Sequence, residues 1–543
     1  MDRPRCAAGR SEVIAAHGMV ATSQPLAVMA GVDVLRRGGT AVDAAIAANA
    51  MLGLVEPMSC GLGGDLFAIV WDAKAERLHG LNGSGRAPRA MTRASFADRG
   101  LDRIPDRGPL TWTVPGCVDG WFALHERFGR LPMSELLAPT IAAADEGFPV
   151  SPVIGRAWSR ATELLASDPG ARETFLIDGR APRVGERMRN PALAASLRAI
   201  ATRDRGGFYR GPIAEAIAAS AGAHGGFLEL DDLASHDSTW VEPISTTYRG
   251  FDVWELPPNT QGLAVLQMLS LLEGFDLRAL GHNSTELLHL WIEAKKLAYE
   301  DRARHYADPA FAEVPLDRLL SKEHAVAQRA RIDPARAADA FPPLDGPPGD
   351  GDTVYLTAVD EERNAVSFIQ SIYQGFGSGI APGGVGFAMQ NRGSLFALDP
   401  THANALEPGK RPFHTIIPGF VTKHERPLFS FGVMGGDMQP QGQVQVLLNR
   451  LVFGMDVEEA GAAARIRHDG SSTPVGDVMS DGGTVHVEPG ISDDVVDGLR
   501  ARGHRVEVST DGYGGYQGIW IDEAHGVLRG GSERRKDGCA IGY

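Results

Sequence analysis

One threonine in this sequence is placed where its hydroxyl could act as a nucleophile. Thr353 follows the short polar run GDGD and precedes the apolar run VYL. A hydroxyl is a poor nucleophile unless a base lies beside it. If the peptide bond between Asp352 and Thr353 is cut, the new α-amino group, with a pKa of about 7.7–8, can serve as that base. Taken alone, a threonine at the start of a strand is more often simply a residue that favours β-structure.

The stretch before Thr353 has the composition of a linker. Residues 333–352 read DPARAADAFPPLDGPPGDGD and are rich in proline, glycine and aspartate. Such a segment has too little apolar surface to fold by itself, so we expect it to be exposed and mobile. Proteolysis concentrates in segments of this kind. The composition therefore favours a cut near the end of this stretch.

The elements that follow Thr353 must hold it in place. Residues 354–359 and 365–372 alternate about a polar turn, which predicts an antiparallel hairpin. Farther along, the patterns predict strands at 415–421, 428–433, 484–488, 505–508 and 517–522, with helices at 443–453 and 493–502. Strands that cluster with packing helices favour stacked antiparallel sheets covered by helices, an α+β fold.

The part of the chain before the linker carries more helix signals, above all from residue 110 to 330. The patterns predict helices at 25–35, 41–54, 262–272 and 286–304, a hairpin of strands at 66–71 and 77–81, and a strand at 251–255. Segment 286–304 is periodic but rich in charge, so we expect a helix with a solvated face over a core.

The composition excludes several classes of function. The 53 Lys and Arg against 68 Asp and Glu give a formal net charge of −15, which argues against nucleic acid and anionic membranes as partners. The four cysteines form no C-x-x-C pair and no HExxH motif occurs, so we expect no metal and no cofactor. No apolar stretch is long enough for a membrane span or an export signal, which predicts a cytoplasmic protein.

Seven stretches of the chain, taken in order, resemble the γ-glutamyltransferase family of N-terminal-nucleophile hydrolases. The resemblance runs from about Gly18 to Tyr543. The stretches are GMVATSQPLAVMAGVDVLRRGGTAVDAAIAANAMLGLVEPMSCGLGGDLF, TVPGCVDGWFALHERFG, LPPNTQGLAVLQMLSLLEGFDL, DTVYLTAVDEERNAVSFIQS, GFGSGIAPGGVGF, PGKRPFHTIIP and DGCAIGY. The resemblance implies an αββα sandwich of two stacked antiparallel sheets covered by helices.

The resemblance also implies roles for particular residues. The family's nucleophile falls on Thr353, so self-cleavage after Asp352 would give a large segment, 1–352, and a small segment, 353–543, which together form one core. The backbone N–H groups of Gly435 and Gly436 would bind the oxyanion of the tetrahedral intermediate. Ser371 matches the family's second hydroxyl residue, which lies beside the nucleophile. Water or an amine acceptor would then release the acyl group.

The residues that hold a glutamyl group in the family differ here. In the segment LNGSGRAP, Ser84 stands where the family has an arginine, and Arg86 follows two residues later. The other altered positions are Tyr373, the run Gln390-Asn391-Arg392-Gly393-Ser394-Leu395, and the pair His414-Thr415. An α-ammonium needs a nearby carboxylate, which Leu395 cannot supply. The candidate substrate-binding residues are Arg86, Tyr373, Asn391, Arg392, His414 and Thr415.

Three interpretations of function follow. Arg392, with Arg86 and His414, could bind a carboxylate, because arginine is a favoured donor to planar anions. The altered positions resemble a cytoplasmic branch of the family that includes oxamate amidohydrolase, and also acylase-like members. We therefore favour a small amide that bears a carboxylate. The alternatives are a γ-glutamyl donor such as glutathione, and an unprocessed pseudoenzyme with a binding role. We expect a heterodimer of the chain's own two fragments, with a dimer of these heterodimers as an open alternative.

Overall fold

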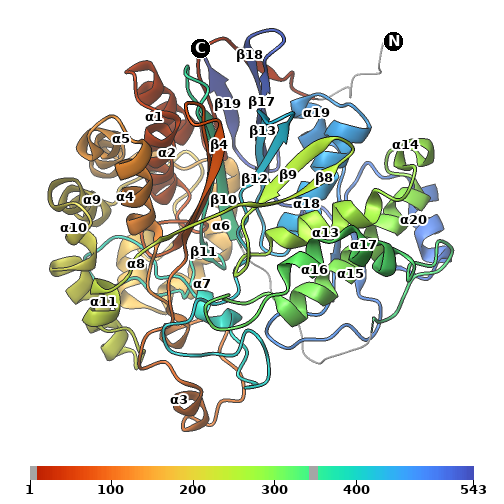
Figure 1. Cartoon of the computed structure of the whole chain (residues 1–543). Coiled ribbons are helices and arrows are strands. Elements are labelled where there is room, and N and C mark those ends of the chain that lie inside the picture. The colour runs from red at the N-terminus through yellow and green to blue at the C-terminus, as the bar shows by residue number, and fades with distance from the viewer. Residues whose placement is uncertain (1–8, 342–351) are drawn as a thin grey trace.

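The computed structural model describes residues 9–341 and 352–543. Within these residues two sheets of seven strands stack face to face, and helices cover both outer sides (Figure 1). The structure therefore has the predicted αββα architecture. The first sheet runs in the order β1 (Val13–Ala15), β18 (Val527–Ser532), β17 (Tyr516–Asp522), β13 (Arg426–Val433), β12 (Gly419–Lys423), β9 (Phe251–Glu255), β8 (Ile244–Tyr248).

The second sheet contains the predicted nucleophile. Its order is β19 (Cys539–Gly542), β2 (Met19–Thr22), β10 (Asp352–Val359), β11 (Ala365–Tyr373), β3 (Asp65–Asp72), β4 (Arg77–Gly83), β7 (Thr239–Val241). The predicted hairpin is confirmed, since β10 and β11 pair antiparallel with Val359 opposite Ala365. In both sheets, strands that precede Thr353 in the chain pair with strands that follow it.

Two smaller sheets lie outside the sandwich. One has β14 (Ile466–Asp469), β15 (Thr484–Val487) and β16 (Arg505–Val508), and the other has β5 (Phe148–Pro149) and β6 (Arg187–Met188). The strand predicted at 415–421 begins only at Gly419. The reason is that residues 415–418 turn toward the site, where the backbone N–H of Ile417 donates to Gln439 Oε1 at 3.0 Å instead of to a neighbouring strand.

One helical layer covers the sheet that contains β10. Alanine-rich α2 packs on β10 and β11, and α1, α4 and α5 surround it. In Figure 1 these helices lie on the left. The layer and its extensions are α1 (Pro25–Arg36), α2 (Ala41–Val55), α3 (Arg93–Ala97), α4 (Cys117–Phe128), α5 (Met133–Glu146), α6 (Pro152–Arg160), α7 (Thr162–Ala166), α8 (Pro169–Phe175), α9 (Pro191–Arg203), α10 (Gly206–Tyr209), α11 (Pro212–Ala223) and α12 (Leu230–Ala234).

The other helical layer packs on the sheet that contains β13. Helix α13 packs on β8 and β9, and α18 packs on β13. The helices are α13 (Gly262–Leu272), α14 (Leu277–Leu280), α15 (Thr285–His305), α16 (Leu316–Leu320), α17 (Lys322–Arg329), α18 (Met438–Leu447), α19 (Val457–Ala462) and α20 (Asp493–Ala501). Helix α18 starts five residues earlier than predicted and continues as a π-helical turn, Leu448–Val452. The described helices contain none that is both long and apolar enough to cross a bilayer.

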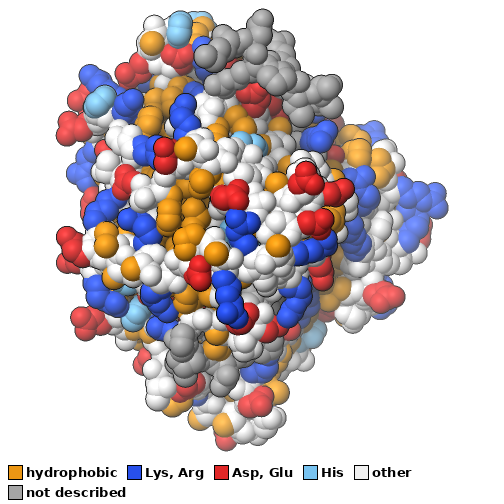
Figure 2. Space-filling view, turned by 90° about the vertical axis from the view of Figure 1, so that its right-hand side faces the viewer, with side chains coloured by type: hydrophobic (Ala, Val, Ile, Leu, Met, Phe, Trp, Pro, Cys, Tyr) orange, Lys and Arg blue, Asp and Glu red, His pale blue; other side chains and the backbone are white. Residues whose placement is uncertain are grey.

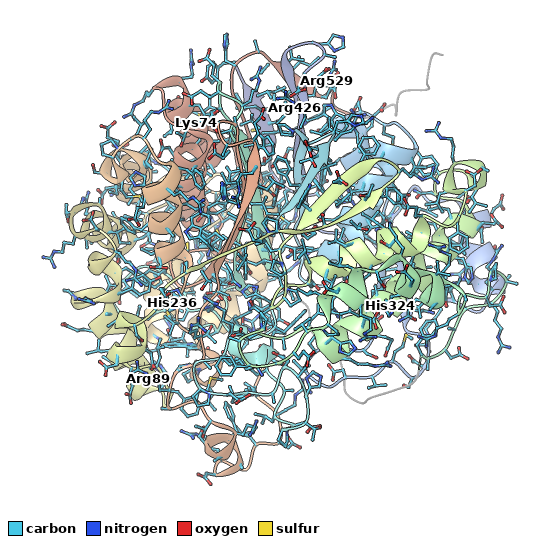
Figure 3. All side chains as sticks on the ribbon, in the orientation of Figure 1. Lys74, Arg89, His236, His324, Arg426 and Arg529 are labelled. Atoms are coloured by element: carbon cyan, nitrogen blue, oxygen red, sulfur yellow. The ribbon has the colours of Figure 1, made fainter. Side chains whose placement is uncertain are left out.

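The prediction for helix α15 was wrong in one respect. Its charged residues were expected to face solvent, but every residue from Leu287 to Ala303 is buried. The charges are tolerated because distant segments pair with them: His324 of α17, labelled in Figure 3, places Nε2 2.7 Å from Asp301 Oδ2. At the surface seen in Figure 2, by contrast, acidic and basic side chains are interspersed.

The predicted linker is only partly described. Residues 342–351, where mobility was expected, lie outside the described residues. The preceding residues are irregular and mostly exposed, but Ala337 and Phe341 are buried. The N–H of Ala337 donates to Arg502 O at 2.7 Å, and Lys296 Nζ donates to Ala338 O at 2.8 Å. This part of the stretch is therefore held against α15 and the end of α20.

Candidate active site

Thr353 lies at the start of β10, where the pairing with β11 shifts by a bulge between Asp352 and Val354. Its side chain is only 1% exposed. The Thr353 hydroxyl donates to Ser371 Oγ at 3.4 Å, and Gln439 Nε2 donates to Thr353 Oγ1 at 3.3 Å. In the uncut chain the Thr353 nitrogen is still an amide, so the site has a positioned hydroxyl but not yet its base.

Ser371 connects the predicted nucleophile to a buried cation. Ser371 Oγ accepts from Arg392 Nη2 at 3.0 Å and from the N–H of Tyr373 at 2.8 Å. Tyr373 ends β11 with a φ of +77°, an unusual conformation for a residue with a Cβ. The turn brings the Tyr373 ring to 4.5 Å from the Arg392 guanidinium. The pair Thr353–Ser371 therefore sits beside a positive charge.

The predicted oxyanion glycines form a tight turn between β13 and α18. Gly435 and Gly436 have φ values of +113° and +57°, which glycine adopts without strain. Their carbonyls accept from the backbone N–H groups of Met438 at 2.9 Å and Gln439 at 3.1 Å. Among the described residues, neither glycine N–H has an acceptor. Both donors lie at the positive end of α18, which suits a developing oxyanion.

Arg392 is fully buried, yet no carboxylate of the described residues contacts it directly. Besides Ser371 it donates through Nη1 to Thr415 Oγ1 at 2.8 Å, and its Nε has no partner among the described residues. Burial lowers the pKa of Arg392 to about 10, with Asp65 opposing the shift. The guanidinium therefore remains charged at neutral pH.

Asp65, at the start of β3, opposes this charge without contacting Arg392 and was not singled out from the sequence. Its Oδ1 accepts from the N–H groups of Gly85 at 2.9 Å and Gly116 at 3.1 Å, and from Gln390 Nε2 at 2.9 Å. Burial raises the pKa of Asp65 to about 6, although Arg392 lowers it. This carboxylate is therefore ionised above about pH 6 only because its hydrogen bonds and Arg392 favour the charged form.

His414 is placed differently from what we expected. Its Nδ1 accepts from the N–H of Ile416 at 3.4 Å, so Nε2 carries the proton and donates to Asp65 Oδ2 at 3.1 Å. Burial and the Arg392 charge hold the pKa of His414 well below its ordinary value. The imidazole is neutral with both nitrogens occupied, which corrects the expectation that it could bind a substrate carboxylate.

Two other candidates support the site from outside. Arg86 Nη1 donates to Gly409 O at 3.2 Å and lies 3.9 Å from Asp308, and it contacts neither Thr353 nor Arg392. Asn391 fastens loops, because its Nδ2 donates to Asp106 O at 2.7 Å and its Oδ1 accepts from the N–H of Gln374 at 3.1 Å. The structure thus brings together Thr353, Ser371, Tyr373, Arg392 and Thr415. The glycine turn is joined to them through Gln439, whose N–H donates to Gly436 O and whose side chain donates to Thr353.

One described group has the composition of a metal site, and it joins two residues of α15 to one that follows α20. The ligand atoms of His289, Glu293 and His504 lie within 4.8 Å of one another. Protein partners already satisfy them, since His289 Nδ1 lies 2.8 Å from His504 Nε2 and Lys296 donates to Glu293 at 2.8 Å. A cavity of about 280 Å³ lies beside His504 and Lys296 and is not lined by Thr353.

Comparison with known proteins agrees with this geometry. The sequence model of the Gamma-glutamyltranspeptidase family matches residues 27–543. The chain belongs to that family. It is 38% identical to the glutathione hydrolase-like YwrD proenzyme of Bacillus subtilis, over 98% of this chain and 99% of the relative. It is 35% identical to the oxamate amidohydrolase proenzyme of Klebsiella pneumoniae, over 98% of this chain and all of the relative.

The fold of this chain is also close to that of an acylase whose structure has been solved. The cephalosporin acylase from Bacillus halodurans superposes with a TM-score of 0.91 at 43% identity, over 100% of this chain and 99% of that one. The chain is thus an enzyme of the γ-glutamyltransferase family, an N-terminal-nucleophile amidohydrolase, and its relatives are proenzymes. Their names cover several substrates, so the substrate has to be argued from the site.

Proposed function

We propose that this chain cuts itself between Asp352 and Thr353 and then hydrolyses a small amide whose carboxylate lies close to the scissile bond. The observation that carries the substrate class is the buried cation Arg392, which donates to Ser371 at 3.0 Å beside the Thr353 hydroxyl. No carboxylate occupies the position of Leu395, which packs instead in an apolar cluster with Tyr373 and Phe413. An anionic acyl group is therefore better matched than one with an ammonium.

The first reaction is internal. Thr353 Oγ attacks the carbonyl carbon of Asp352, and the acyl group passes from the Thr353 nitrogen to its oxygen. Water then hydrolyses the ester, which leaves a carboxylate on Asp352 and an ammonium or amine on Thr353. The products are fragments of 352 and 191 residues. Gln439, which donates to Thr353 Oγ1, orients the hydroxyl for this step.

The second reaction uses the freed amine as base. It accepts the hydroxyl proton while Oγ attacks the amide carbon, and the oxyanion develops toward the N–H groups of Gly435 and Gly436. The ammonium then protonates the leaving amine, and water repeats the cycle on the acyl-enzyme. A carboxylate on the carbon next to the amide, as in oxamate, lies close enough to Arg392 for a strong attraction in this buried setting.

Two measurements test the proposal in turn. Intact mass spectrometry should find two fragments for the native protein and one uncut, inactive chain for Thr353→Ala. Ammonia release from oxamate should then exceed p-nitroaniline release from a γ-glutamyl anilide. An active enzyme whose chain is still continuous at Asp352–Thr353 would rule out the mechanism. Preference for the γ-glutamyl donor would rule out only the substrate class.

A further inference from the structure

Gln261, which precedes α13, joins the two halves of the active site. Its Nε2 donates to Gly436 O at 2.9 Å and to Thr415 O at 2.6 Å, and its Oε1 accepts from Arg302 Nη1 at 2.7 Å. The side chain is fully buried. A flipped amide would set its oxygen against two carbonyls and its NH₂ against a guanidinium, so the hydrogen bonds fix its orientation.

The bond to Gly436 O holds the peptide unit that directly follows the two oxyanion donors. A peptide unit is planar and trans, so the direction of a carbonyl sets the direction of the N–H in the same unit. Met438 holds the unit before Gly436, and Gln439 together with Gln261 holds the unit after it. A glycine with positive φ rotates easily when it is not held. Gln261 thus restricts rotation on the C-terminal side of Gly436, and this limits the movement of the whole turn that carries the donors.

The bond to Thr415 reaches the nucleophile by another route. Thr415 Oγ1 accepts from Arg392 Nη1 at 2.8 Å, and Arg392 Nη2 donates to Ser371 Oγ at 3.0 Å. Ser371 in turn accepts from the Thr353 hydroxyl. One amide therefore contacts both the oxyanion turn and the chain of hydrogen bonds that ends at the nucleophile.

Arg302 of α15 holds Gln261 in place. The same Nη1 donates to Asp437 Oδ1 at 2.7 Å, and the guanidinium lies 3.8 Å from the Tyr299 ring. Tyr299 donates its hydroxyl to Asp437 O at 2.6 Å, next to the glycine turn. Gln261 and Arg302 precede Thr353 in the chain, whereas the groups they hold follow it. The two segments would thus stay aligned at the site after cleavage.

We propose that Gln261 is a positioning residue that keeps the oxyanion turn and the nucleophile in register, with Arg302 as its anchor. This inference rests on the proposed use of Thr353 as the nucleophile. Gln261→Glu is the sharpest variant, because a carboxylate keeps the size of the side chain and the contact with Arg302 but cannot donate to either carbonyl. A small misplacement of catalytic groups costs about 10- to 100-fold in rate.

The test compares Gln261→Glu with Gln267→Glu. Gln267 is a buried glutamine within α13, and its side chain contacts Asp301, at 2.8 Å, and Tyr306, at 2.6 Å, instead of the glycine turn. We expect Gln261→Glu to slow self-cleavage and to lower kcat on the cleaved fraction about 10- to 100-fold, with KM within about twofold. Gln267→Glu should lower Tm but leave kcat within about twofold. Arg302→Lys should lower kcat less than Gln261→Glu does.

The outcomes separate the two proposals. Equal kcat in Gln261→Glu and native protein, at equal fraction cleaved, would overturn the role of Gln261. Equal losses in the two glutamine variants would do the same, because they would show a general loss of stability. A native chain that never cuts at Thr353 would instead overturn the proposed function. The self-cleavage rate needs no added substrate, so an error in the substrate class would not affect this test.

Discussion

Two buried arginines belong to the hydrogen-bond network around Thr353, the proposed nucleophile, and their surroundings are opposite in kind. Arg302 and Arg392 both lie over a tyrosine ring, at 3.8 and 4.5 Å. Arg302 makes a direct ion pair with Asp437 at 2.7 Å, whereas Arg392 donates only to the hydroxyls of Ser371 and Thr415. A carboxylate in direct contact therefore neutralises the charge of Arg302. The charge of Arg392 is opposed by Asp65, which does not contact it, and remains able to attract an anion.

The pKa shifts of the two groups follow the same division. Burial lowers the pKa of both guanidinium groups. For Arg302 the attraction of Asp437, with help from Tyr299, outweighs burial and raises the pKa above its ordinary value. For Arg392 burial prevails and the pKa falls to about 10. A contacting carboxylate compensates the charge of a buried arginine within the protein, whereas a buried arginine that donates only to neutral acceptors leaves its charge available to an anionic ligand.

The largest effect is expected from removing the unbalanced charge. Arg392→Gln should lower kcat/KM for a carboxylate-bearing amide about 10- to 100-fold, because a charge-assisted interaction is lost. Hydrolysis of an uncharged amide by the same variant should fall much less. Parallel kinetics on the two substrates measure the difference. Equal losses on both would mean that Arg392 does not select the acyl group.

The neutralised charge should give the reverse pattern. Arg302→Gln should lower the free energy of unfolding by about 2–3 kcal/mol, below the usual cost of breaking a fully buried pair because Asp437 is one-third exposed. Its effect on rate should be the same for charged and uncharged amides. Urea unfolding and the same pair of substrates provide the test. A change in substrate preference would show that the two arginines do not differ as described.

The distant partner of Arg392 should make stability depend on pH. The folded pKa of Asp65, about 6, lies above its ordinary 3.8, so its contribution to stability is complete below pH 3.8 and is lost as pH rises through 6. The asparagine side chain of the Asp65→Asn variant does not titrate. Relative to the native protein, the variant should therefore gain about 2–3 kcal/mol in unfolding free energy between pH 4 and 7. If the unfolding free energies of the two proteins changed with pH in parallel, the raised pKa of Asp65 would be contradicted.

The smallest effect is expected at a third arginine, Arg86. It was a candidate for substrate binding, but its contacts are with Gly409 and Asp308. Arg86→Ala should change kcat/KM by less than about twofold, as is usual away from the reacting groups. Assay beside Arg392→Gln makes the comparison direct. A loss of more than about tenfold would return Arg86 to the binding site.

Local patterns predicted much of the fold. The β10–β11 hairpin follows from its alternation, and helix 262–272 was predicted with the bounds that the structure has. Alternation and helical periodicity indicate which face each element buries, and both patterns can be read from a short window of neighbouring residues. The burial of α15 escaped them, because its charges are paired by residues such as Asp437 that lie far along the chain.

By itself the sequence, through its resemblance to the family, determined which hydroxyl is the candidate nucleophile, at the start of a strand behind a linker-like stretch, and which glycines are the candidate oxyanion donors. Only the tertiary structure decided what surrounds them. Gln439 meets Thr353 across 86 residues, Gln261 meets Gly436 across 175, and His414 meets Asp65 across 349. No local sequence pattern can encode such pairs, because they form only once both sheets and their helices have packed. Burial in the packed structure then determines the protonation state and the hydrogen-bond partner of each group.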